Sequence, residues 1–202
     1  MNRRAPTLTF TALTALVAAG CQLPRPPEKR PVDNYLAEPT DLANVRRVMV
    51  LPFAEDPGVA ADCNKLRDIY VGELQKLRRF EIVPLPGDTL EVDELNRSVR
   101  RGRLSTDAVV RLCNRYSLDG VLVGTVTAWR PYTPPILGMR TQLVSVHSGA
   151  VVWAVDAIYD SSDRSTVSDL RHFHDRVQQD DGNLHGWELD LIAPSRFSAY
   201  VA

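Results

Sequence analysis

The sequence predicts an α/β domain in which a mixed sheet of about five strands carries helices packed against it, with a C-terminal β-hairpin followed by a helix. Two observations predict this class. Short β-branched runs alternate with helical patterns between residues 48 and 129. A hairpin pattern then occupies residues 140–159 and precedes a polar helical stretch. Alternating and segregated elements in one chain favour a mixed sheet.

A strand, a helix and a second strand open the domain. Residues 48–53, Val-Met-Val-Leu-Pro-Phe, form the short apolar run that is typical of a buried strand. Residues 61–78 place their apolar side chains at helical spacing, and Arg78 and Arg79 suit the C-terminal end of a helix dipole. Residues 80–84 predict the second strand.

The remaining elements follow from caps, turns and periodicity. Ser105 is typical of a helix N-cap, and Ser148 with Gly149 is typical of a hairpin turn. The predicted elements are helices at 91–101 and 106–116, strands at 121–129, 140–146 and 151–159, a helix at 160–179, a loop at 180–193 and a helix at 194–202.

The N-terminus has the layout of a secretory signal peptide. Arg3 and Arg4 are followed by an uncharged, largely apolar stretch at residues 8–17 and by small residues up to Cys21. The apolar stretch is shorter than the roughly 20 residues of a membrane-spanning helix. We therefore expect residues 1–20 to be a signal peptide.

Residues 17–21, Val-Ala-Ala-Gly-Cys, resemble the lipobox of bacterial lipoprotein precursors. The resemblance implies cleavage before Cys21, a diacylglyceryl group on its thiol and a further acyl chain such as palmitate on its amino group. Ala18 departs from the leucine that is commonest in the family. An ordinary signal peptide cleaved nearby and a retained membrane anchor are the alternatives. Residue 22 is Gln rather than Asp. By the sorting rule of this family in Gram-negative bacteria, the resemblance then implies the periplasmic face of the outer membrane.

Residues 21–45 predict a Pro-rich tether ahead of the domain at 46–202. A leftover segment without a spacing role is the alternative. Removal of residues 1–20 takes Arg3 and Arg4 from the 24 basic residues and none of the 25 acidic ones, which leaves a net charge of −3. This balance argues against a nucleic-acid partner.

The order of motifs in the domain resembles a family of periplasmic lipoprotein domains. The resemblance rests on residues 48–53, on 79–84, on 116–125 and on the hairpin at 139–156. Together they are similar to the α/β domain shared by CsgG, LpoB and the amino-terminal domain of TolB, over roughly residues 46–160. It implies a role in envelope assembly, activation or export through an envelope protein partner, and it is compatible with a homo-oligomer.

A subunit of an export pore is an alternative function within this family. CsgG forms its pore from amphipathic hairpins inserted in the domain. Here residues 130–138 are only a short Pro-rich loop, whereas each membrane-crossing strand needs about 9–11 residues. We therefore favour a non-enzymatic adaptor or assembly factor over a pore.

The same loop is the predicted partner surface, because stiff apolar and aromatic side chains lose little entropy on binding. The candidate residues are Trp129, Tyr132, Pro134, Pro135, Ile136 and Leu137. The alternative is that these side chains fold back onto the domain. A second aromatic group, made of Trp187, Phe197 and Tyr200, is expected to pack the C-terminus.

No pattern in the chain predicts catalysis. The sequence lacks the common nucleophile and phosphate-binding motifs. A metal-dependent enzyme using His172, His174 and His185 is the alternative, but the helical His-x-x-x-His spacing is absent, so we expect no metal and no cofactor. Cys63 and Cys113 predict either a disulfide or two buried thiols.

Overall fold

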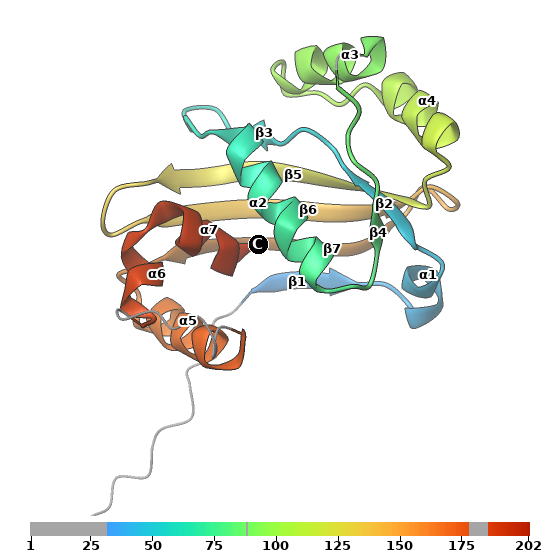
Figure 1. The fold of residues 1–202 in the computed structure, drawn as a ribbon. Helices are drawn as coiled ribbons and strands as arrows, with labels where there is room; N and C mark the ends of the chain where they lie inside the picture. Colours follow the sequence, from blue (N-terminus) through green and yellow to red (C-terminus); the bar gives the residue numbers. More distant parts are fainter. Residues whose placement is uncertain (1–31, 88, 178–185) are drawn as a thin grey trace, which may run out of the picture.

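The computed structural model describes residues 32–87, 89–177 and 186–202 and contains one seven-stranded sheet (Figure 1). The strands are β1 (Asp33–Leu36), β2 (Arg47–Val50), β3 (Ala54–Glu55), β4 (Glu81–Ile82), β5 (Gly120–Arg130), β6 (Ile136–Ser145) and β7 (Val151–Asp160). The helices are α1 (Pro39–Ala43), α2 (Cys63–Lys76), α3 (Leu90–Val99), α4 (Thr106–Tyr116), α5 (Arg164–Val177), α6 (Glu188–Ile192) and α7 (Pro194–Val201).

The sheet is mixed, which confirms the predicted fold class. Its strand order is β1-β7-β6-β5-β2-β4, with β3 beside β5. Strand β2 pairs in parallel with β4 and β5, and β3 pairs in parallel with β5. The β5–β6, β6–β7 and β7–β1 pairs are antiparallel. Helix α2 provides the long crossover that parallel strands β2 and β4 require. The predicted hairpin is β6–β7, and Gly149 takes a φ of 69° in its turn.

Two hydrophobic clusters lie on opposite faces of the sheet. Val48 and Val50 of β2 face the larger cluster, which is covered by α2, α5 and α7, whereas Met49 and Leu51 face the smaller cluster under α3 and α4. All four side chains are at most 1% exposed. Burial on both faces explains why this strand is a continuous apolar run in the sequence.

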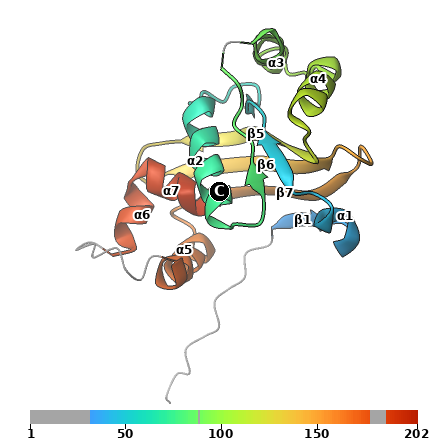
Figure 2. The ribbon, with the colours of Figure 1, turned by 45° about the vertical axis from the view of Figure 1, so that its right-hand side comes forward.

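Helix α2 follows directly from its sequence pattern. Asp62 caps its N-terminus by accepting a hydrogen bond from the backbone N–H of Lys65 at 3.0 Å. Leu66, Tyr70 and Leu74 recur at helical spacing and are buried against the sheet. The helix therefore crosses in front of β5, β6 and β7, while α3 and α4 lie at the β2–β4 end (Figures 1 and 2).

The structure differs from the predicted elements at three places. Strand β1 and helix α1 lie within residues 33–43, in the range predicted as a tether, and the structured part of the chain thus begins earlier. Strand β6 starts at Ile136 instead of residue 140. Helix α6 occupies residues 188–192, where the sequence predicted a loop. Strand β1 escapes prediction because it joins β7 through its backbone while all four of its side chains remain exposed.

One part of the sheet has a face that no described helix covers. Beyond the irregularity at Val152, side chains at even positions of β6 and β7 point away from the larger cluster, and they include Arg140, Gln142, Asp156 and Ile158. We call this surface, formed by β6, β7 and β1, the open face. An antiparallel sheet commonly leaves one face to solvent.

Candidate interaction surface

The loop between β5 and β6 is held in a defined shape by polar contacts. The Arg130 Nε–H donates to the carbonyl oxygen of Pro134 at 2.8 Å, and the Ser161 N–H donates to that of Pro135 at 3.0 Å. The peptide bond between Thr133 and Pro134 is cis. The loop presents Tyr132 to solvent, with 79% of its surface exposed. Tyr132 is therefore a preorganised aromatic group.

The predicted partner surface needs a correction, because two of its residues are buried. Leu137 is 2% exposed and belongs to the larger hydrophobic cluster, and Pro135 is also buried. Trp129 is half-buried and packs against the same cluster. These side chains fold back onto the domain, since odd positions of β6 point into the core. Tyr132, Pro134 and the half-buried Ile136 remain at the surface.

Strand register adds an apolar residue that the sequence analysis missed. Ile136 pairs with Asp160, and Gly138 pairs with Ile158, so Ile136 and Ile158 are diagonal neighbours on the open face. Ile158 is 50% exposed. The alternation of Ala157 and Ile158 in the sequence could have predicted that Ile158 lies on the outer face. Only the strand register shows that it lies beside Ile136.

The middle of the open face is polar. Arg140 and Asp156 are direct cross-strand partners, and the Arg140 Nε–H donates to the Asp156 carboxylate at 2.7 Å. This ion pair and the β1 residues Asp33 and Tyr35 border a shallow depression of about 450 Å³. The candidate interaction surface thus consists of an apolar end, where Ile136 and Ile158 lie next to the loop that carries Tyr132, and a charged centre.

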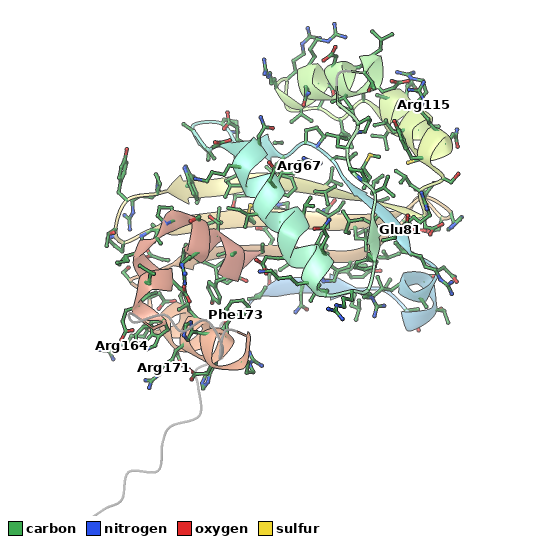
Figure 3. All side chains as sticks on the ribbon, viewed as in Figure 1. Arg67, Glu81, Arg115, Arg164, Arg171 and Phe173 are labelled. Carbon is green, nitrogen blue, oxygen red and sulfur yellow. The ribbon has the colours of Figure 1, made fainter. Side chains whose placement is uncertain are left out.

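The C-terminal helices are tied together by aromatic and charged side chains, which confirms the packing expected for Trp187, Phe197 and Tyr200. The Phe173 ring lies 5.7 Å from that of Tyr200, and both Arg171 and Phe173 project from α5 (Figure 3). The Arg171 guanidinium is 5.8 Å from the Trp187 ring. Phe197 is 1% exposed. These aromatic residues therefore hold α5, α6 and α7 on the sheet.

The histidines predicted as an alternative metal site have other surroundings. The Nδ1 atom of His174 lies 3.0 Å from the carboxylate of Asp190, which also accepts a hydrogen bond from Arg196 at 3.3 Å. His172 is exposed, and His185 lies outside the described residues. In the ranges that the structure describes, no three metal-ligating side chains come together. The described histidines hence offer no metal centre.

The two cysteines of the domain are free thiols, which is the second of the two states that the sequence left open. Cys63 packs against the larger hydrophobic cluster, whereas Cys113 is buried in the smaller one. Burial, with help from the charges of Glu55 and Asp62, raises the pKa of Cys63 to about 11. Burial also raises the pKa of Cys113. Both side chains therefore remain protonated thiols at neutral pH and are poor nucleophiles.

A polar cleft of about 710 Å³ lies between the segment 52–64 and the end of α3. The acidic residues Glu55, Asp56 and Asp62 of the first segment line it together with Arg100 and Arg101. The cleft follows the carboxyl end of β2, a common ligand position in α/β sheets. Its lining holds charges of both signs, and its single thiol is the protonated Cys63.

No protein-family model and no curated protein matches the chain. Among solved structures, the chain is similar to the PelC dodecamer of Paraburkholderia phytofirmans, with 20% identity, a TM-score of 0.47 and coverage of 68% of this chain and 88% of that chain. It is similar to the LpoB C-terminal domain of Salmonella enterica, with 11% identity, a TM-score of 0.41 and coverage of 57% and 82%. A lipoprotein of Neisseria meningitidis gives 16% identity, a TM-score of 0.42 and coverage of 68% and 98%.

The predicted resemblance to an LpoB-like α/β domain is confirmed at the level of the fold. LpoB and a bacterial lipoprotein are among the structures that the chain resembles. At identities of 11% and 16%, these similarities concern the fold alone. Within the described ranges, no helix has both the length and the hydropathy that crossing a bilayer requires.

Proposed function

We propose that this chain is a lipid-anchored, non-enzymatic envelope protein that acts as an adaptor or assembly factor. In this proposal Cys21 carries the lipid at the outer membrane, and the domain faces the periplasm, where its open face binds another envelope protein. The lipobox resemblance at residues 17–21 supports the anchor.

The observation that carries the proposal is the apolar end of the open face. Tyr132 and Ile158 are exposed large side chains, Ile136 is the diagonal neighbour of Ile158 in the strand pairing, and the loop with Tyr132 leads directly into Ile136. Aromatic anchors with a polar surround are typical of protein interfaces. The neighbouring Arg140–Asp156 pair supplies the charged part of such a surround. A protein partner of complementary shape would bury these side chains together.

Site-specific photocrosslinking in living cells tests the proposal. A photoreactive residue is placed at Tyr132 or Ile158, and at Leu90 of α3 as a control, because Leu90 is 82% exposed at the other end of the domain. We expect the first two positions to give one shared adduct with an envelope protein, and Leu90 to give none. Ile158→Lys should abolish the adduct formed from Tyr132, because it places a charge in the contact.

Two outcomes would contradict the adaptor proposal. One is an adduct that forms equally well from Leu90, and the other is an adduct from Tyr132 that survives Ile158→Lys. An adduct with a second copy of this chain would replace the adaptor by a homo-oligomer. The solved PelC structures are dodecamers. Size-exclusion chromatography of the Tyr132→Ala variant then tells whether this surface forms the oligomer.

A further inference from the structure

An apolar cavity of about 330 Å³ lies on the face of the sheet opposite the open face. It opens where α2 ends, between α1 and the turn into β4. The lining residues are Leu42, Val48, Leu74, Leu77, Arg79, Phe80, Leu122, Leu143 and Trp153. Eight of these nine are apolar. A volume of this size falls at the lower end of small-molecule sites, which span about 300–1,000 Å³.

The floor and the mouth of the cavity differ in character. Val48, Leu122 and Leu143 come from three adjacent strands, are at most 3% exposed and form a rigid apolar floor. At the mouth, Leu77 is 66% exposed. A large apolar side chain left in water beside an apolar cavity is unfavourable, so the site is suited to an apolar occupant.

Unpaired positive charge borders the mouth. Arg78 and Arg79 are exposed, and within the described part of the chain no carboxylate forms an ion pair with either. The Arg79 guanidinium lies 5.7 Å from the centroid of the Phe80 ring, which is also a wall of the cavity. Lys76, by contrast, is paired with Glu73. The rim therefore suits an anionic group attached to an apolar chain.

We propose that this cavity takes one acyl chain of an anionic membrane phospholipid, with the tail against the floor and the phosphate beside Arg79. The lining offers hydrogen-bond donors at Arg79 and at the Trp153 indole, but no side-chain acceptor. A peptide segment would leave backbone N–H groups unsatisfied there, whereas a methylene chain leaves nothing unsatisfied.

The position of the cavity agrees with a bilayer lipid as its occupant. Helix α1, strand β1 and the C-terminal end of α2 lie at the same end of the molecule in both views (Figures 1 and 2). The chain that comes from Cys21 enters the described domain at β1. Trp153, a wall of the cavity, pairs with Leu36 at the other end of this four-residue strand. The cavity therefore has bilayer lipid within its surroundings if Cys21 carries the anchor. The open face and its protein partner are separate from this site.

The test uses the mature chain, residues 21–202, with Cys21→Ser, so that no lipid is attached to the protein itself. The protein is mixed with vesicles that contain phosphatidylglycerol with a photoreactive acyl chain, or the matching phosphatidylcholine. We expect labelling of the peptides that contain Leu122, Leu143 or Trp153, and about fivefold or more labelling with the anionic lipid, because each basic residue near an anionic surface favours binding about fivefold.

Two substitutions at the mouth have matched controls on α3 and its following loop. Leu77→Glu and Arg79→Glu should each reduce cavity labelling by about tenfold, whereas Arg79→Lys should keep it. Leu90→Glu and Arg101→Glu change exposed residues that do not line the cavity and should have no effect. Circular dichroism of each variant checks the fold.

Three results would overturn the lipid site. They are labelling confined to other surfaces, labelling of the cavity that is insensitive to Leu77→Glu, and saturation of the cavity by a free fatty acid with no labelling from vesicles. Photocrosslinking in cells from Trp153 to a protein, with no lipid adduct, would also overturn it. None of these results affects the adduct expected from Tyr132, so the two proposals fail separately.

Discussion

The ring of Phe53 occupies the space into which a side chain on Gly124 would project. A Cβ atom added to Gly124 would lie 2.5 Å from the Cε1 atom of Phe53 and 2.6 Å from its Cδ1 atom. Phe53 is 4% exposed and also makes an edge-on contact with Tyr70, with ring centroids 5.6 Å apart. The ring thus has little room to move away, and the position in β5 requires glycine for close approach.

Gly124→Ala should lower the free energy of unfolding by about 1–3 kcal/mol, because the added methyl group overpacks the core. Denaturant titration of the mature Cys21→Ser chain measures the change. Gly72→Ala on α2 is the matched control, since a Cβ atom there meets nothing within 4 Å. In a helix this control should stabilise by up to about 1 kcal/mol. Equal effects of the two substitutions would contradict the packing of Phe53 over Gly124.

Asp190→Ala should destabilise the attachment of the C-terminal helices. The carboxylate is 1% exposed and accepts hydrogen bonds from His174 on α5 and from Arg196 on α7. We expect the free energy of unfolding to fall by about 2–3 kcal/mol. This is less than the cost of breaking a fully buried ion pair, because Arg196 reaches solvent. Limited proteolysis near residue 186 should also accelerate. Asp175→Asn, at an exposed position of α5, should change neither measurement. An Asp190→Ala variant with unchanged stability would refute the role of this carboxylate.

Acid should remove a stabilising contribution of Asp119. Hydrogen bonds from the backbone N–H of Arg47, then from that of Arg46 and from His147, lower the pKa of this carboxyl group below its ordinary value. A depressed pKa in the folded state means that the contribution is present above the unfolded pKa, near 4, and is lost as the pH falls through the folded value. Asp119→Asn should therefore be less stable than the parent at pH 7, and the difference should shrink below about pH 4. A difference that is constant between pH 7 and pH 3 would contradict this linkage.

Both domain cysteines should react slowly while the protein is folded. With a pKa of about 11, Cys63 is ionised to roughly one part in a thousand at pH 8. Alkylation of the mature Cys21→Ser chain should be slow in buffer, and it should add two groups in denaturant without any reductant. Intact-mass measurement counts these groups. An unreduced sample that accepts none in denaturant would mean that Cys63 and Cys113 are bonded.

The sequence predicted those elements whose side chains repeat with the period of their structure. Strand β2 and helix α2 are such cases, because burial of their apolar positions determines both the pattern and the fold. Strand β1 has no such pattern, since its pairing with β7 needs only the backbone. The start of β6 was missed because the prolines at 134 and 135 indicated a loop, although pairing already begins at Ile136.

The sites were less predictable than the fold, because they combine residues that are distant in the sequence. Tyr132 was proposed from its loop and is exposed, whereas Leu137 was assigned to the surface although its position in β6 points into the core. The cavity escaped prediction entirely. Its walls include Leu42, Leu77 and Trp153, which only the sheet order and the path of α2 bring together.

The early start of β1 limits how far the domain can move from a lipid on Cys21. Twelve residue steps separate Cys21 from Asp33, and a fully extended chain of that length spans roughly 40 Å at most. Had the linker run to residue 45, its contour would have been about twice as long. In the proposed lipid-anchored form, the domain therefore stays close to the membrane. A partner of the open face would have to present its binding site within that distance of the membrane surface.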